Sequence, residues 1–66
     1  MITFQVDDMS CGHCVGVITR AVKEADGGAG VHIDLSKHLV QIEPADADAE
    51  QLRAAIVEAG YTPVAL

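Results

Sequence analysis

The apolar residues of this chain are spaced first by two residues and then by about 3.6, and the order of these periods constrains the fold most. Apolar and polar residues alternate from Ile2 to Val6, which predicts a half-buried strand. The next apolar positions share one face of a helix: Val15, Ile18, Val22 and Ala25. The glycine-rich run 26–30 ends that helix, so the first 30 residues predict a strand followed by a helix.

The second half of the chain repeats this change of period. Apolar residues alternate over 31–35 and again over 40–42, which predicts a hairpin that Pro44 ends. Asp48 is a predicted helix N-cap, because Gln51 follows at the spacing of a capping box. The helix after it has an apolar face made of Leu52, Ala55, Ile56 and Ala59. Gly60 is the expected residue just past its C-terminus.

A last strand is predicted over 61–66, and Pro63 restricts it to a sheet edge because proline has no amide proton to donate. The resulting order, βαββαβ, predicts an α+β fold, the ferredoxin-like sandwich, with both helices on one face of a four-stranded antiparallel sheet. The expected spatial order of the strands is 4-1-3-2. Right-handed crossovers then bring three connections to one end of the sheet. The residues expected at that end are Cys11, Cys14, Lys37, His38, Gly60 and Tyr61.

Length and composition limit the functions available to this fold. Residues 1–66 are expected to form one domain, too small to enclose a substrate, so we do not expect an enzyme. No apolar run approaches the roughly 18 residues of a membrane span, and a strand starting at Ile2 leaves no room for a secretory signal. A cytoplasmic protein with reduced thiols is therefore predicted.

The charge balance bears on partners. Ten acidic residues against four Lys and Arg give a net charge of −6, which argues against nucleic acid as a partner. Two interpretations of this charge stay open. It either docks the protein on a basic surface or only keeps a small protein soluble.

Both cysteines lie within four residues, at Cys11 and Cys14, between the first strand and the first helix. A helix N-terminus favours the thiolate form, which is both the metal ligand and the redox nucleophile. A disulfide would close a loop too short to restrain the unfolded chain appreciably. Soft-metal binding and dithiol redox chemistry therefore both remain open.

Two alternatives for the cysteine pair can be weighed on sequence. Cys-Gly-His-Cys is also the tetrapeptide of protein disulfide isomerases, but this chain is too short for a thioredoxin fold and has Ser10 where those enzymes have an aromatic residue. A zinc finger would need His32 and His38 on one helix, whereas both are expected as exposed residues on opposite arms of the hairpin, with His38 at the turn that faces the cysteines.

Three features together identify a resemblance: Met9-x-Cys11-x-x-Cys14, the βαββαβ order and Ala59-Gly60-Tyr61 before the last strand. They resemble the heavy-metal-associated domain family, and within it the bacterial CopZ-type copper chaperones. The resemblance implies that Cys11 and Cys14 bind Cu(I) and pass it to the N-terminal metal-binding domain of a copper-transporting P-type ATPase. Paired thiolates are also expected to bind Hg(II), Ag(I), Cd(II) or Zn(II). A copper-bridged homodimer or glutathione is expected to complete the open site.

The residues around the cysteines have expected roles as well. Met9 is predicted to pack in the core, and Gly12 to give the loop backbone freedom. His13 is predicted to point to solvent as a bystander to the metal. Tyr61 is predicted either to donate toward a thiolate or to cover the edge of the core. Ser10 stands where zinc- and cadmium-exporting relatives often have an acidic residue, which favours copper.

Overall fold

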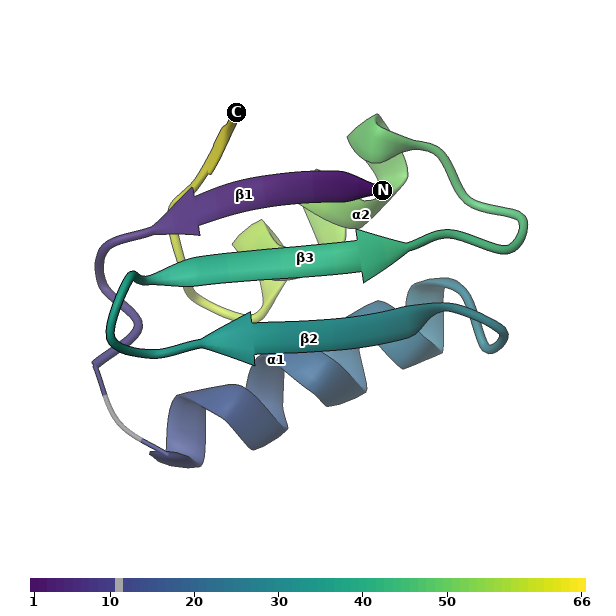
Figure 1. Ribbon diagram of the computed structural model, residues 1–66. Helices are drawn as coiled ribbons and strands as arrows, with labels where there is room; N and C mark the ends of the chain where they lie inside the picture. The colour runs from purple at the N-terminus through teal and green to yellow at the C-terminus, as the bar shows by residue number, and fades with distance from the viewer. Residues whose placement is uncertain (11) are drawn as a thin grey trace.

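The computed structural model describes residues 1–10 and 12–66 of the chain. Six elements occur in the predicted order, and their bounds are β1 (Ile2–Val6), α1 (Gly12–Ala25), β2 (Gly30–Asp34), β3 (Leu39–Glu43), α2 (Ala49–Glu58) and β4 (Pro63–Ala65). Both helices lie on one face of the sheet (Figure 1), so the predicted ferredoxin-like sandwich is confirmed. Across the described ranges, no helix is both long and apolar enough to cross a membrane.

The sheet has the predicted strand order, β2-β3-β1-β4, and each neighbouring pair is antiparallel. In the central pair Phe4 lies opposite Val40, and on the other side of β1 Gln5 lies opposite Val64. Strand β4 contains Pro63 and lies at the edge of the sheet, where it pairs only with β1. The amide proton that proline lacks is therefore not needed for pairing with a second strand.

The core lies between the sheet and the helices. The strands contribute Phe4, Val6, Val40 and Ile42, and the helices contribute Ile18, Val22, Leu52 and Ile56, each at most 1% exposed. Complete burial of one such side chain contributes roughly 1.5–3 kcal/mol, so these contacts fix the position of the helices on the sheet.

Helix α1 differs from the prediction at its C-terminal end. Cys14, Ile18 and Val22 are buried at four-residue intervals, which turns one face of the helix toward the sheet. Ala25, predicted on the apolar face, is exposed, and the next residue, Asp26, is buried instead. The burial is possible because the Asp26 carboxylate accepts several backbone hydrogen bonds from the β3–α2 connection.

Helix α2 begins and ends as predicted. Asp48 Oδ1 accepts a bond from the Gln51 amide at 2.9 Å, and Gln51 Oε1 accepts one from the Asp48 amide at 3.0 Å, which completes the capping box. Gly60 has a φ of 100°, in the left-handed region that favours glycine.

The last strand is shorter than predicted, because it begins at Pro63 rather than at Tyr61. The Thr62 amide donates instead to Asp8 Oδ1 at 3.2 Å, and Pro63 has no amide proton.

Candidate metal-binding site

Three connections meet at one end of the sheet, at the left of Figure 1: the β1–α1 loop, the β2–β3 turn and the α2–β4 connection. Hydrogen bonds join them. His38 Nδ1 is 2.8 Å from the Met9 carbonyl oxygen, and Gln5 Nε2, in β1, donates to the Lys37 carbonyl of the β2–β3 turn at 3.1 Å. The Thr62–Asp8 bond ties the third connection to the loop. The end predicted to carry the cysteines is therefore assembled as expected from the residues that the structure describes.

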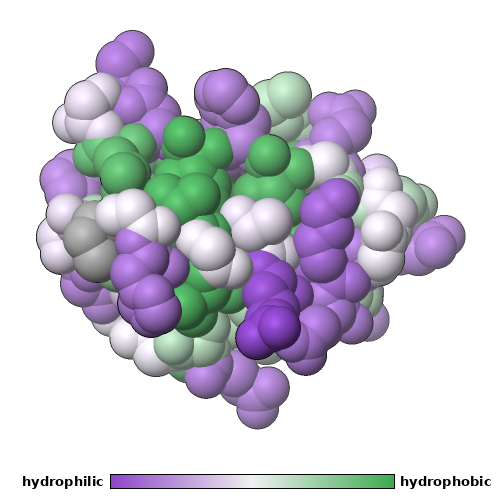
Figure 2. Space-filling model, turned by 90° about the horizontal axis from the view of Figure 1, so that it is seen from below, coloured by the Kyte–Doolittle hydropathy of each residue, from purple (hydrophilic) through white to green (hydrophobic). Residues whose placement is uncertain are grey.

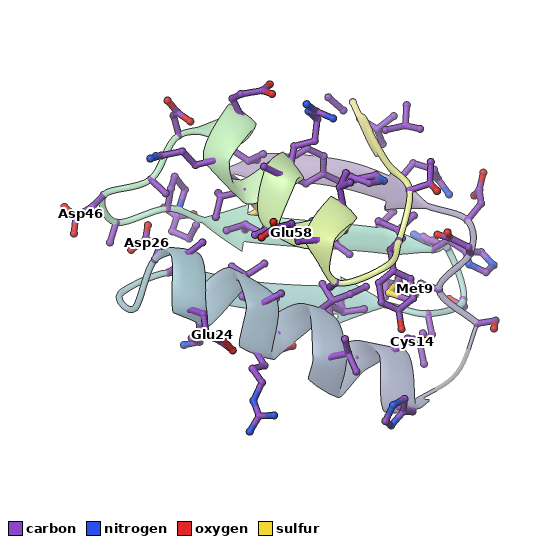
Figure 3. All side chains as sticks on the ribbon, turned by 180° about the vertical axis from the view of Figure 1, so that it is seen from behind. Met9, Cys14, Glu24, Asp26, Asp46 and Glu58 are labelled. Carbon is purple, nitrogen blue, oxygen red and sulfur yellow. The ribbon has the colours of Figure 1, made fainter. Side chains whose placement is uncertain are left out.

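Cys14 is the third residue of α1 and is 8% exposed. Its side chain belongs to the hydrophobic core cluster, together with Met9, and both lie at the same end of the molecule in Figure 3. The first turn of a helix has backbone N–H groups without intrahelical partners, which favour a nearby anion such as a thiolate. Cys11, the other predicted ligand, lies outside the described residues.

Met9 anchors the loop that leads to the cysteines. Its side chain is 0% exposed, as predicted for a core residue rather than a ligand. Its amide donates to the Val6 carbonyl at 3.2 Å, and its carbonyl oxygen is the atom that faces His38. The chain is thus held in place two residues before Cys11.

Gly12 was predicted to give the loop backbone freedom, and the structure places it at the start of α1. It is the first residue of α1 and does not belong to the loop, and an added Cβ would meet nothing within 4 Å among the described residues. Its φ is not in the left-handed region, so the described backbone does not require glycine here.

His13 is exposed, as expected for a side chain that points to solvent. It borders an open hollow of about 300 Å³ together with Gly16, Val17 and Arg20 on the same side of α1.

Tyr61 follows Gly60 in the α2–β4 connection, and its amide donates to the Ile56 carbonyl at 3.3 Å. Its half-buried side chain packs against the core cluster. This agrees with the predicted covering of the core edge. The alternative, donation to a thiolate, remains a prediction.

The two histidines considered for a zinc finger have different surroundings. His32 is an exposed residue in the middle of β2, opposite Gln41, as predicted. His38 lies in the turn before β3 with a φ of 57°, and it is half-buried rather than exposed as predicted. Within residues 1–10 and 12–66, no three His, Cys, Asp or Glu side chains are grouped to hold a metal ion. Sequence reasoning missed the contact of His38 with the loop, although it placed the residue at the correct end.

Asp34 shapes the turn that carries His38. Its Oδ1 accepts bonds from the Ser36 hydroxyl at 2.6 Å, from the Ser36 amide at 3.0 Å and from the Lys37 amide at 3.3 Å. The Ser36 hydroxyl is the main reason why the pKa of this carboxyl lies below its usual range. An aspartate that caps its own turn in this way fixes the backbone locally.

A second hollow, of about 450 Å³, lies between α1 and α2. Its walls are mostly small apolar side chains, and Glu24 and Glu58 project from the two helices beside it (Figure 3). Figure 2 shows apolar surface on the face seen from below, with hydrophilic side chains around it. Arg20 also lines this hollow, so its charged residues are of both signs.

Comparisons with known proteins agree on one family. The chain matches the sequence model of the heavy-metal-associated domain over residues 3–62. The COP-associated protein of Helicobacter felis is 43% identical over 61 residues, covering 91% of this chain and 92% of that protein. The copper chaperone CopZ of Bacillus subtilis is 39% identical over 62 residues, covering 89% of this chain and 88% of that protein.

Solved structures show the same fold. A trimeric form of a variant of the copper chaperone Atx1 from Synechocystis PCC6803 superposes with a TM-score of 0.92 at 38% identity, covering 97% of this chain and 100% of that one. A gold-binding protein superposes with a TM-score of 0.93 at 33% identity, covering both chains completely. The N-terminal domain of PacS from Synechocystis PCC6803 shares the fold, with a TM-score of 0.85 at 23% identity, over 98% of this chain and 94% of that one.

Proposed function

Because the chain belongs to the heavy-metal-associated domain family, we propose that it is a copper chaperone that binds Cu(I) through Cys11 and Cys14. The observation that carries the proposal is the placement of Cys14 in the first turn of α1, next to a loop anchored by the buried Met9. Relatives named as copper chaperones share 39% and 38% of its residues over nearly the whole chain.

The chemistry of the ligands supports a carrier of soft metals. Thiolates are soft ligands and select Cu(I) over hard cations. Two thiolates on one loop leave the coordination shell of the metal open, whereas structural zinc sites are closed by four ligands. An incoming thiolate can therefore bind before the first one leaves. Cu(I) would pass by ligand exchange, with no change in its oxidation state.

The receiver we propose is the N-terminal metal-binding domain of a copper-transporting P-type ATPase. The PacS N-terminal domain shares the fold of this chain, which is compatible with an exchange between two domains of one fold. The net charge of −6 favours a partner with a basic surface. Without that partner, a second copy of this chain or glutathione would supply the additional thiolates, and the metal-free protein would be monomeric.

Other soft metals form the second candidate. The gold-binding protein shares the fold and 33% of the sequence, so the same cysteine pair is proposed to accept other thiophilic ions such as Ag(I) or Hg(II). A dithiol redox function has less support, because Cys-Gly-His-Cys is here part of a ferredoxin-like fold and not of a thioredoxin fold.

Anaerobic titration with Cu(I) against a competing chelator tests the proposal. The wild-type protein should bind one Cu(I) per chain, and both Cys11→Ser and Cys14→Ser should weaken binding severely. Cys14 is buried, so the unfolding of its variant must be measured as well, and Cys11→Ser carries the test if Cys14→Ser unfolds. Ser10→Ala is the matched control in the same loop and should bind as the wild type does.

The opposite outcomes are equally specific. Tight Cu(I) binding by Cys11→Ser would exclude the assigned ligand pair. Weak Cu(I) binding by the wild type, together with rapid thiol–disulfide exchange, would favour the redox function. Competition with Ag(I), Hg(II), Cd(II) and Zn(II) would rank the metals.

A further inference from the structure

His38 contacts the cysteine loop from a distant part of the chain. Its Nδ1 lies 2.8 Å from the carbonyl oxygen of Met9, although 29 residues separate the two. A peptide carbonyl can only accept a hydrogen bond, so Nδ1 must carry the proton and donate it. The accepting carbonyl belongs to the residue two positions before Cys11.

The backbone around His38 aims its ring at the loop. Its φ of 57° places it in the left-handed region, which few side chains adopt without cost. Its carbonyl accepts a bond from the Val6 amide at 2.8 Å, and its amide donates to Leu35 at 3.4 Å. The turn before it is fixed by the Asp34 carboxylate. The ring is therefore carried by a turn that is itself bonded to the end of β1.

We propose that His38 is a positioning residue for metal binding, which acts through the Met9 carbonyl to hold the segment that leads to Cys11. This inference rests on the proposed function, because it concerns the same site. Met9 is held from both sides, by its buried side chain and by the bond from His38 to its carbonyl. A loop that is ordered before the metal arrives loses less conformational freedom on binding, so the affinity of the protein for Cu(I) is higher.

The first test uses the metal-free protein. Nitrogen-15 NMR of histidine-labelled protein distinguishes the two neutral tautomers of each imidazole, and His13→Asn and His32→Asn assign the three rings. The Nδ1-protonated tautomer is expected for His38. The Nε2-protonated tautomer would overturn the proposal, because the bare Nδ1 would then face a carbonyl oxygen and could not donate to it.

The second test separates the hydrogen bond from the backbone conformation. His38→Gly accepts the left-handed conformation but has no donor. His38→Asn also tolerates this conformation, and its amide nitrogen is as many bonds from Cα as Nδ1 is in histidine. Cu(I) affinity should fall about three- to tenfold in His38→Gly, as for the loss of one hydrogen bond, and return to within about twofold in His38→Asn. His32→Asn, a change on the exposed middle of β2, is the matched control.

Each outcome decides the proposal. Wild-type Cu(I) affinity in His38→Gly would overturn it. Equal losses in the Gly and Asn variants, in step with their urea midpoints, would show that the residue is only structural and would also overturn it. If the wild type itself binds no Cu(I), the proposed function fails, while the tautomer measurement still tests the contact of His38 with Met9.

Discussion

Oδ2 of Asp26 accepts a hydrogen bond from the Ala47 amide at 3.0 Å, across 21 residues of sequence. The same oxygen accepts bonds from the amides of Ala45 at 2.8 Å and Asp46 at 2.9 Å, and Oδ1 accepts one from Gly28 at 3.3 Å. The carboxylate thus ties the end of α1 to the β3–α2 connection, at the opposite end of the molecule from Met9 and Cys14 (Figure 3). The residue is 4% exposed, and the backbone donors, led by Ala47, lower the pKa of Asp26 to about 2.

Asp26→Asn should destabilise the protein at neutral pH. It should also make the free energy of unfolding depend less on pH in the acid range. The pKa of Asp26 is about 2 in the folded protein and 3.8 as its ordinary value, so the stabilisation is complete above about pH 4. It is lost as the pH falls from about 4 to about 2, because the unfolded chain takes up the proton first. Urea unfolding at pH 7 and at steps down to pH 2 measures the effect.

Asp46→Asn, in the same connection, is the control for Asp26→Asn because the Asp46 side chain is exposed. It should leave the urea midpoint at pH 7 nearly unchanged. A midpoint for Asp26→Asn equal to that of Asp46→Asn would show that the four backbone bonds do not stabilise the fold.

The contrast between Asp26 and Val22 shows how far the sequence predicts this structure. The apolar period identified Val22 as a core residue and gave the element order, because burial of apolar side chains repeats with the local geometry. The strand order was then expected from the ferredoxin-like fold that this element order predicts. The buried Asp26 follows no such period, since it depends on amides from a distant connection. An aspartate before two glycines is also a common helix end, so the pattern alone could not distinguish these roles.

In the candidate site too, some features were predicted from the sequence and others were not. The burial of Met9 was predicted from the family resemblance and from its position beside the strand, and the exposure of His13 from its position between the cysteines. Both are confirmed. The contact of His38 with Met9 and its left-handed conformation were not predicted, because the conformation of a turn residue is set by the hydrogen bonds around it and leaves no apolar period. Gly12 was expected in the loop, whereas it is the first residue of α1.

Met9→Ala should lower the free energy of unfolding by about 2–5 kcal/mol, because the side chain is fully buried and its loss leaves a cavity under the loop. Met1→Ala is the matched control, since Met1 is 77% exposed and should contribute little. Urea unfolding of the metal-free proteins makes the comparison. Equal stability of the two variants would contradict the core placement of Met9.

Asp48→Ala should cost about 1 kcal/mol of stability, because it removes the acceptor that caps the first turn of α2. Asp48→Ser should retain most of this contribution, since a serine hydroxyl also accepts a bond at an N-cap. Thermal unfolding followed by circular dichroism measures both. A Ser variant as unstable as the Ala variant would argue against a capping role.

Two glycines are expected to respond in opposite directions to alanine. A Cβ at Gly28 would lie 2.9 Å from the Ala45 Cβ, so Gly28→Ala should destabilise the protein by about 1–3 kcal/mol. A Cβ at Gly16 would meet nothing within 4 Å among the described residues, and this helical position should gain about 0.5–1 kcal/mol in Gly16→Ala. Chemical denaturation of both variants checks the signs, and a stabilising Gly28→Ala would mean that the two connections are not in close contact.

Neither Tyr61 nor His13 should be essential for metal binding, because the proposed charge-bearing ligands are the two cysteines. Tyr61→Phe keeps the ring that packs against the core and removes only the hydroxyl, so its Cu(I) affinity should change by at most about tenfold, the effect of one hydrogen bond. His13→Ala removes an exposed side chain and should have an effect no larger than that. Chelator competition under anaerobic conditions measures both variants beside Cys11→Ser. If His13→Ala loses affinity by several orders of magnitude, the imidazole is itself a ligand, and the Cu(I) site must be assigned to three residues instead of two.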